Sequence, residues 1–233
     1  MARRICLRDR LRPRWTFDLE DACKQAQIEP EVAKALIPKL EPLLESAMKK
    51  EGFYDQLLNR VQEMRMFTLN NLHFLNSLFF EKVKLNVELD PREHSIIFLV
   101  HYLISVESFF SDVVDILCFA LVAQHHDLAD FFRRTYVERM SDLEDLSLAD
   151  RLRFLSRHGW EEAEQAVDRN LRNSSAHANY ELREDGTIVM AGTTLSIERD
   201  DFNRKSEALR DFIYGFWVAL NKFFVERYGL GFV

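Results

Sequence analysis

Hydrophobic residues recur at helical spacing along most of this chain. Between residues 53 and 87 they fall three or four positions apart, which predicts one long helix. A second series predicts a final helix that is capped by Asp200 or Asp201 and ends near Tyr228. The two apolar faces comprise Leu57, Leu58, Val61, Met64, Leu72, Leu75, Leu78 and Phe79 in the first helix, and Leu209, Phe212, Ile213, Phe216, Leu220, Phe223 and Phe224 in the last.

Start and stop signals locate the other helices. Asp90 can cap a helix whose first residue is Pro91, and Glu93 can return a bond to the cap, so a helix is expected from there to about Ala123. Another helix should follow Ser147 as its cap and stop near Gly159. The expected helices cover residues 18–27, 90–123, 127–139, 148–157 and 160–175, and Pro30, Pro38 and Pro42 are expected to divide the stretch after residue 27 into pieces.

The period of the pattern changes after residue 175. Tyr180–Leu182 and Thr187–Met190 are β-prone and flank the turn sequence Glu-Asp-Gly, which predicts a β-hairpin. Only seven glycines and five prolines punctuate the chain, so long helical segments are favoured. The expected fold class is all-α, a mainly helical bundle with one short β-hairpin between the last two helices.

A line of polar residues runs along the apolar helix expected at 90–123. Its members follow one another at steps of four, three, four and three, so they share one face of the helix. Such a stripe is typical of the solvent-facing side of a surface helix, and it would also suit the lining of a cleft or a subunit interface. The residues of this polar line are His101, Ser105, Ser108, Asp112 and Asp115.

Charge is unevenly distributed along the chain. The first fourteen residues carry six arginines and one acid, Asp9, so this arm has a charge of +5, and the remainder carries −12 for a total of −7. Asp9 and Pro13 argue against an organellar transit peptide. The arm is either a solvated tail or a segment that contacts phosphates. For a chain of 233 residues we expect the arm and a helical lobe over residues 1–89 and the main helical domain over residues 90–233.

Composition narrows the class of protein. Hydrophobic residues make up 47% and charged residues 30%, which is typical of a folded globular protein, and no stretch is apolar enough to span a membrane. The three cysteines, Cys6, Cys23 and Cys118, form no close pair in the sequence. They indicate neither a disulfide framework nor a zinc site, which favours a reducing compartment and a cytoplasmic location.

Common catalytic signatures are missing from the sequence. There is no glycine-rich phosphate loop and no serine or cysteine nucleophile signature. His125 and His126, with Asp127 and Asp130, lack the further Cys or His that would complete a metal site. We therefore expect no metal and no cofactor.

The candidate chemistry lies where the string RNSSAH ends a predicted helix. Arg172 carries a permanently charged fork that matches a phosphate, and His177 can exchange protons near neutral pH. Together they suit a phosphodiester, because a guanidinium stabilises charge on the phosphoryl oxygens and an imidazole moves a proton. No metal is required when the ribose 2′-hydroxyl is the nucleophile.

The spacing of this pair sets a condition on the helix. Five positions on an ideal α-helix separate two side chains by about 140°, so Arg172 and His177 converge only if the helix loosens after Arg172. The intervening serines and Asn179 favour loosening, since their side chains compete for backbone hydrogen bonds. A structural interpretation is also open, in which Arg172 pairs with Asp168 and His177 interacts with a helix C-terminus.

RNSSAH, at the end of a helix and before a tyrosine and a hairpin, resembles the signature of the HEPN superfamily. That signature is an Arg, a polar residue that is often Asn, a short spacer and a His, and the resemblance covers residues 92–228 in outline. It implies an α-helical domain that dimerises so that two motifs face each other across one cleft, acting as a metal-independent endoribonuclease. By similarity, Arg172 and His177 would be catalytic, and Asn173 would orient them or the phosphate.

The resemblance also implies partners. Members often act in host defence, toxin–antitoxin or RNA-processing systems, so the expected partners are RNA, a second copy, and an antitoxin or regulatory protein. The alternative is a non-catalytic HEPN-like dimeric module that binds a partner protein or a nucleotide, which the acidic body of the chain favours. In one subgroup a tyrosine two residues after the histidine is nucleotidylated. Here Tyr180 follows His177 by three residues, which favours a packing role.

Overall fold

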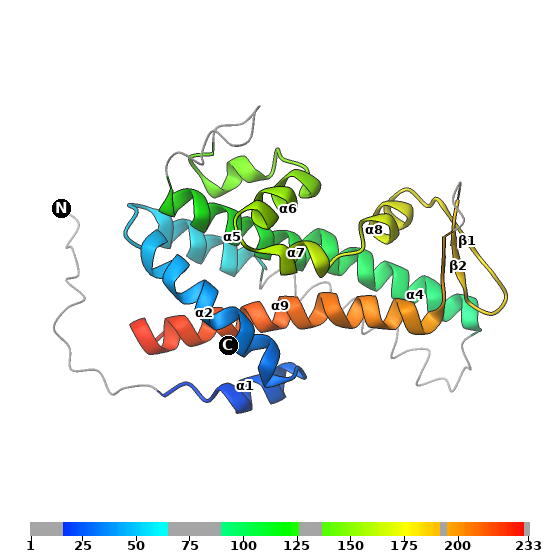
Figure 1. The fold of residues 1–233 in the computed structure, drawn as a ribbon, viewed down its shortest axis with the longest axis horizontal. Coiled ribbons are helices and arrows are strands. Elements are labelled where there is room, and N and C mark those ends of the chain that lie inside the picture. Colours follow the sequence, from blue (N-terminus) through cyan, green and yellow to red (C-terminus); the bar gives the residue numbers. More distant parts are fainter. Residues whose placement is uncertain (1–15, 65–89, 126–136, 192–194, 231–233) are drawn as a thin grey trace. The chain divides into compact units, whose positions relative to one another are not determined.

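The computed structural model describes residues 16–64, 90–125, 137–191 and 195–230 (Figure 1). These parts of the chain are mainly helical, with a small antiparallel sheet near the C-terminal end, which confirms the expected fold class. The basic arm, the second part of the helix expected at 53–87, and most of the helix expected at 127–139 lie outside the described residues. None of the described helices is long and apolar enough to cross a bilayer.

The chain divides into two compact units. The first comprises residues 1–41 and 214–233, and the second comprises residues 42–213. Both division points fall inside helices, α2 (Pro30–Ala47) and α9 (Arg199–Tyr228), so each of these helices contributes to both units. The boundary expected between residues 89 and 90 adjoins residues 65–89, which lie outside the described residues, and it stays a prediction.

The first unit draws on both ends of the chain. It contains α1 (Leu19–Ala26), the first part of α2 and the last part of α9. Asp18 caps α1 by accepting a hydrogen bond from the N–H of Asp21 at 3.0 Å. One buried cluster, to which Val218 of α9 belongs, unites the early and late segments, because apolar side chains are stabilised by leaving water. Its buried members are Cys23, Ile28, Ala33 and Val218.

The helix α2 continues without interruption through Pro38 and Pro42, so the expectation that prolines divide this stretch is wrong. A proline inside a helix removes one hydrogen bond and crowds the preceding turn. Burial of an apolar face opposes that loss, since most helical stability in proteins comes from packing. The buried leucines of α2 are Leu36, Leu40, Leu43 and Leu44.

In the second unit, the helix expected from Asp90 to Ala123 is one continuous helical run with a change of pitch. Asp90 caps it by accepting a hydrogen bond from the N–H of Arg92 at 2.8 Å. A π-helical turn in the middle widens the spacing locally and shifts the faces of the helix on either side of it. The three segments are α4 (Pro91–Ile104), η1 (Ser105–Phe110) and α5 (Ser111–Gln124).

Four short elements follow α5 in the described chain. Residues 137–139 are not helical. The helix over Leu148–Arg157 has the expected bounds, and Ser147 caps it by accepting a hydrogen bond from the N–H of Asp150 at 3.1 Å. The single helix expected over 160–175 is wrong, because an extended residue divides it in two. The elements are η3 (Met140–Leu143), a 3-10 turn, and the α-helices α6 (Leu148–Arg157), α7 (Glu161–Gln165) and α8 (Arg169–Ala176).

The end of the polar line does not face solvent as a surface stripe would, because Asp115 is buried and Asp112 is half-buried. Asp115 is 2% exposed and accepts hydrogen bonds from Arg60 at 3.0 Å and from Arg151 of α6. Arg60, in the helix over residues 53–64, also lies 3.5 Å from Asp112. Buried charges persist only when they are paired, so these carboxylates link α5 to two neighbouring helices.

Asp112→Asn is expected to stabilise the protein at pH 8 by about 1–2 kcal/mol. Burial raises the pKa of Asp112 to about 7, with the charge of Arg60 opposing the rise. Because this folded-state pKa exceeds that of the unfolded chain, the stabilisation due to protonation is complete below about pH 4 and is lost as pH rises through 7. Asparagine avoids burying the charge but loses part of the Arg60 contact.

Urea unfolding of both proteins at pH 5 and pH 8 measures this effect. The advantage of the variant should be larger at pH 8 than at pH 5, whereas Asp145→Asn, at an exposed position, should show no such difference. If the free energy of unfolding changed equally between pH 5 and pH 8 in the wild type and in Asp112→Asn, the raised pKa of Asp112 would be contradicted.

The hairpin expected after residue 175 is present, with a third strand that the sequence did not indicate. The strands are β1 (Tyr180–Leu182), β2 (Ile188–Met190) and β3 (Ser196–Ile197), in the order β1-β2-β3 and all antiparallel. The hairpin turn is fixed on α4, because the Ser95 hydroxyl donates to the Gly186 carbonyl oxygen at 2.7 Å. Gly186 has a φ of +84°, and a Cβ there would lie 2.9 Å from the Pro91 carbonyl oxygen.

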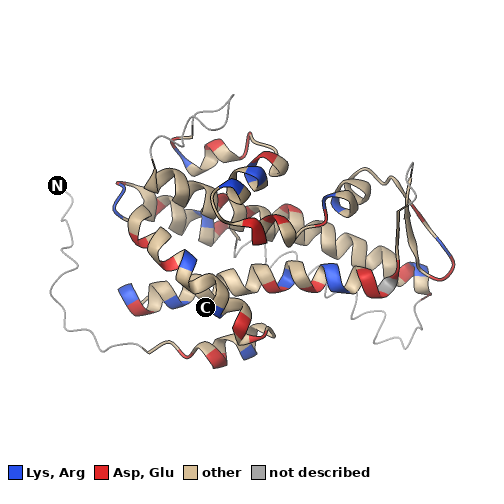
Figure 2. Ribbon diagram, viewed as in Figure 1, with Lys and Arg blue, Asp and Glu red and all other residues tan. Residues whose placement is uncertain are grey.

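The last helix, α9, ends at the expected residue but begins one residue before the expected caps. Asp200 and Asp201 therefore lie in its first turn, where carboxylates interact favourably with the helix dipole. All seven residues of its predicted apolar face are buried. Basic and acidic residues are interspersed in the first part and in the last turns of α9, and the stretch between Asp211 and Lys222 is uncharged (Figure 2).

Candidate functional site

The start of α8 is held by two other helices. The N–H of Asp168 donates to the Tyr102 hydroxyl of α4 at 2.8 Å, and Lys205 Nζ of α9 lies 2.6 Å from Asp168 Oδ2. Asp168 Oδ1 accepts from the N–H of Leu171 at 2.9 Å and so caps α8. These bonds fix α8 against α4 (Figure 1).

The protonation of these two anchors is set by their surroundings. Burial raises the pKa of Tyr102, so its hydroxyl remains protonated at neutral pH. Burial also acts to raise the pKa of Asp168, but hydrogen bonds from Lys205 and from the N–H of Leu171 outweigh it and hold the pKa below its ordinary value. The cap is therefore an ionised carboxylate, which suits the positive end of a helix.

Arg172 is held on two sides. Its Nε donates to Glu107 Oε1 of η1 at 2.5 Å, and its Nη1 donates to Asn173 Oδ1 at 3.0 Å. The expected pairing of Arg172 with Asp168 is wrong, because Lys205 takes that carboxylate. A guanidinium has five N–H groups, and no described residue accepts a hydrogen bond from Nη2. The contacts of Arg172 thus orient the fork and leave N–H groups for an anion.

His177 is the residue at which α8 ends. The helix is regular through Ala176, so the loosening expected after Arg172 begins only at His177, which has φ −101° and ψ 6°. Its side chain is exposed, and within the described residues it makes no hydrogen bond, to Arg172 or to any other group. Arg172 therefore lies within α8 and His177 is its C-cap, and no hydrogen bond joins the two side chains.

A left-handed residue turns the chain after His177. Ala178 has a φ of +50°, and the N–H groups of Asn179 and Ala178 donate to the carbonyls of Ser174 at 2.8 Å and Ser175 at 3.2 Å. This is a Schellman motif, whose left-handed position usually carries glycine. The motif fixes where the helix stops and presents His177 at its exposed end.

Ala178→Gly should stabilise the protein by about 0.5–1 kcal/mol, because glycine adopts a positive φ without the steric penalty of a Cβ. Chemical denaturation of the two proteins tests this. The matched variant Ala176→Gly, inside the same helix, should destabilise by a similar amount. Destabilisation by Ala178→Gly would show that the residue is not strained.

The residues that orient the site were not identified from the sequence. Glu107 lies off the polar line and inside the π-turn, and the roles of Tyr102 and Lys205 depend on contacts across more than thirty positions of sequence. The π-turn could not be anticipated from spacing alone, although such turns often occur at functional sites. Tyr180, the first residue of β1, is half-buried.

Neither the cysteines nor the histidines of the described residues form an evident metal site. Cys23 and Cys118 are buried free thiols, and Cys6 lies outside the described residues. His125 ends α5 as its exposed C-cap, whereas His126 and the aspartates considered with it lie outside the described residues. Within the described parts of the chain, no group of three or more His, Cys, Asp or Glu is arranged to hold a metal ion.

Comparisons with known proteins identified no relative: no family model, no curated protein and no solved structure matches the chain.

Proposed function

We propose that this protein is a metal-independent endoribonuclease of HEPN type that acts as a cytoplasmic homodimer. The observation that carries the proposal is the state of Arg172, which a carboxylate and an amide hold in place while N–H groups of its fork remain for a phosphate. His177 is exposed at the end of the same eight-residue helix. Arg172 and His177 are the catalytic residues of this proposal, and Asn173 and Glu107 position Arg172.

The proposed reaction is an internal transesterification of RNA. The 2′-oxygen bonds to the adjacent phosphorus and the bond from phosphorus to the 5′-oxygen breaks, which leaves a 2′,3′-cyclic phosphate and a 5′-hydroxyl. One group must accept the 2′-hydroxyl proton and another must protonate the 5′-oxygen. Each chain offers one motif histidine, so a two-fold dimer that joins two motifs supplies both groups, while the arginines stabilise the phosphoryl charge.

The surface of α4 supports association with a second copy. Ile96 is 45% exposed and Val100 is 40% exposed, and four residues of separation put them on one face of the helix. Exposed apolar neighbours of this kind often mark interaction sites. Ile96 and Val100 lie on α4, the helix against which α8 packs. A dimer formed through this face would therefore bring the Arg172–His177 motifs of the two copies close to one another.

Val100→Glu is expected to convert the dimer to a monomer at about 10 μM, because a charge would be buried at the contact. Light scattering with size-exclusion chromatography measures the mass. The control Leu195→Glu replaces another exposed apolar residue, 48% exposed and outside α4, and should remain dimeric. A wild-type monomer, or a dimer unaffected by Val100→Glu, would contradict this interface.

The biological setting of the proposal comes from the motif resemblance. A component of antiviral defence or of a toxin–antitoxin system, with an antitoxin or another regulatory partner, is the role that it favours. The acidic body of the chain requires that positive charge be concentrated at the site, and the two Arg172 side chains and the basic arms of a dimer would supply it.

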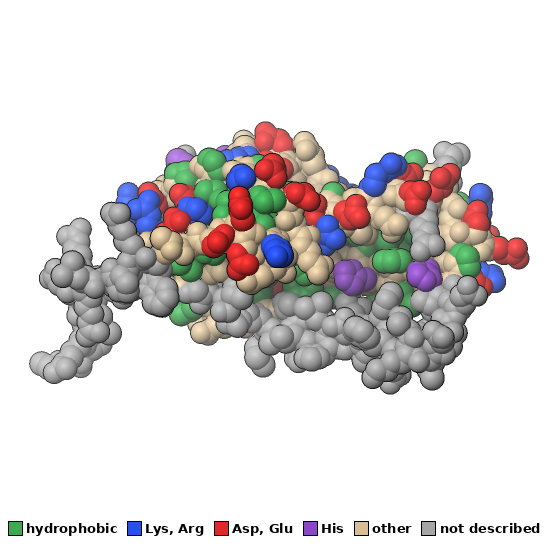
Figure 3. All heavy atoms as spheres, turned by 90° about the horizontal axis from the view of Figure 1, so that it is seen from below, with side chains coloured by type: hydrophobic (Ala, Val, Ile, Leu, Met, Phe, Trp, Pro, Cys, Tyr) green, Lys and Arg blue, Asp and Glu red, His purple; other side chains and the backbone are tan. Residues whose placement is uncertain are grey.

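A second candidate function is a HEPN-like dimeric module that binds a partner protein or nucleotide without catalysis. Two observations favour it. Glu107 already neutralises part of the charge of Arg172. On the face shown in Figure 3, the described acidic and basic side chains are interspersed and form no broad basic patch. Such a module would keep Arg172 for recognition alone.

The decisive experiment is cleavage of RNA in excess EDTA. The wild type should cut RNA and leave cyclic phosphate and 5′-hydroxyl ends, and DNA of the same sequence should survive because it lacks the nucleophile. A strict requirement for a divalent metal would contradict the mechanism. A protein inert on a broad set of single-stranded and structured RNAs would favour the binding module.

A further inference from the structure

An open hollow of about 500 Å³ lies beside the start of α8. One wall is the end of α7 and its connection to α8, residues 164–168, and the other is one face of α9. Ala166 and Val167 in the first wall are buried and apolar. The residues of the α9 wall are Asp201, Arg204, Lys205 and Ala208, which follow the spacing of a single helix face.

The charged groups at the hollow include both donors and acceptors. Lys205 pairs with Asp168 at 2.6 Å, and Arg204 pairs with Asp201 across one turn of α9. Glu164 pairs with Arg169, just outside the lining. A phosphate would face three carboxylates here, whereas a nucleobase offers donors and acceptors along its edge and an apolar face for stacking.

Asp168, which lines the hollow, precedes the proposed catalytic arginine by one helical turn. The N–H of Arg172 donates to the Asp168 carbonyl oxygen at 2.9 Å, and four residues of helix advance about 6 Å. The volume is also within the range of small-ligand pockets, roughly 300–1,000 Å³. A base attached next to a phosphate at Arg172 could therefore reach it.

We propose that this hollow is a subsite for the nucleobase next to the scissile phosphate, an inference that rests on the proposed ribonuclease function. Arg204 stacks on the base or donates to it, as arginine planes commonly do in RNA recognition. Asp201 and Glu164 accept hydrogen bonds from an exocyclic amino group, which favours cytosine, adenine and guanine over uracil.

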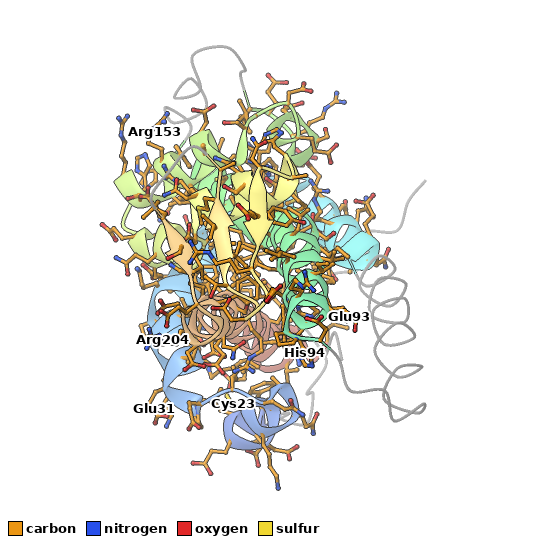
Figure 4. All side chains as sticks on the ribbon, turned by 90° about the vertical axis from the view of Figure 1, so that its right-hand side faces the viewer. Cys23, Glu31, Glu93, His94, Arg153 and Arg204 are labelled. Carbon is orange, nitrogen blue, oxygen red and sulfur yellow. The ribbon has the colours of Figure 1, made fainter. Side chains whose placement is uncertain are left out.

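Arg204→Ala tests the subsite and has a close structural control. Arg204 projects from α9, and Arg153 projects from α6 (Figure 4). Both are exposed, at 74% and 54% of the side chain, and both pair with an aspartate three residues earlier, so loss of either should leave the fold intact. The probes are the nucleoside monophosphates CMP, AMP, GMP and UMP, with binding measured by ligand-observed NMR in EDTA.

Arg204→Ala should weaken binding of CMP, AMP and GMP about fivefold or more, and Arg153→Ala should leave it unchanged. Asp201→Asn, which can donate as well as accept, should reduce the preference over UMP by a similar factor. Equal binding by Arg204→Ala and Arg153→Ala, or equal binding of all four nucleotides by the wild type, would overturn the subsite.

Cleavage assays separate this inference from the function on which it rests. With an active enzyme, Arg204→Ala should raise KM about fivefold with little change in kcat, because the base is bound equally in ground state and transition state. Suppose that no RNA is cut, but the wild type still binds CMP, AMP and GMP in preference to UMP and Arg204→Ala weakens that binding. The ribonuclease proposal then fails and the base site stands. If RNA is cut and Arg204→Ala matches Arg153→Ala in KM, the function stands and the subsite is refuted.

Discussion

Substitution of His177 by alanine should lower the rate of RNA cleavage about 10²–10⁴-fold, the range associated with loss of a general acid or base. The imidazole is exposed at the end of α8 and makes no hydrogen bond within the described structure, so its removal should not disturb folding. In a dimer the substitution removes both proton-transfer groups at once. Single-turnover cleavage with saturating enzyme isolates this step from binding.

The control for this experiment is His125→Ala. His125 is also exposed and also follows the last residue of a helix, α5, yet it belongs to no proposed site. It should cleave at the wild-type rate. If His177→Ala keeps full activity while folding and dimerising normally, the enzymatic proposal fails and the binding module replaces it.

Arg172→Ala should lower the rate about 10²–10³-fold, comparable to the loss of a donor that stabilises a developing anion. Stability should change little, since the Arg172–Glu107 pair is partly exposed, with 29% and 43% of the side chains accessible. Asn173→Ala should cost less than Arg172→Ala, because it removes only one orienting contact. Arg169→Ala, on the same helix and also ion-paired, should change the rate at most a few-fold.

Two variants of Glu107 distinguish whether this residue positions Arg172 or only neutralises its charge. Glu107→Gln keeps an oxygen that accepts from Arg172 Nε, so it should retain most activity, whereas Glu107→Ala should lose about tenfold, mainly in kcat. Retained activity in Glu107→Gln would show that the residue acts by positioning Arg172, because glutamine has the same shape and no charge. Faster cleavage by both variants would mean that the carboxylate inhibits the site by occupying the guanidinium.

Local signals were sufficient for elements whose ends are set by their own side chains. Ser147 and Asp90 each accept the hydrogen bond that starts a helix, and the α6 bounds follow from this chemistry alone. The hairpin was evident from β-prone runs around a turn ending in Gly186, which takes the required positive φ. Apolar spacing likewise identified the buried face of α9, because periodicity and burial have the same cause.

Elsewhere, packing overrode local preference. Two prolines remain inside α2, where buried leucines offset the lost hydrogen bonds. A helix expected as one piece divides at Asp168, because its side chain caps α8 while Tyr102 and Lys205 hold it in place. Asp112 and Asp115, whose helical spacing suggested a solvent-facing stripe, are instead half-buried and buried, and they form ion pairs with Arg60 and Arg151.

The sequence by itself determined the helical class, most helix starts, the hairpin, and the presence of Arg172, Asn173 and His177 where a helix ends. Only the tertiary structure decided that Glu107 holds Arg172, that α8 packs on α4 with its cap Asp168 paired to Lys205 of α9, and that a hollow adjoins it. The physical reason is the separation in sequence over which each interaction acts. Capping and periodicity act within a few residues, whereas an ion pair between Glu107 and Arg172 depends on how two helices pack, and a π-turn that no local pattern announces lies at that contact.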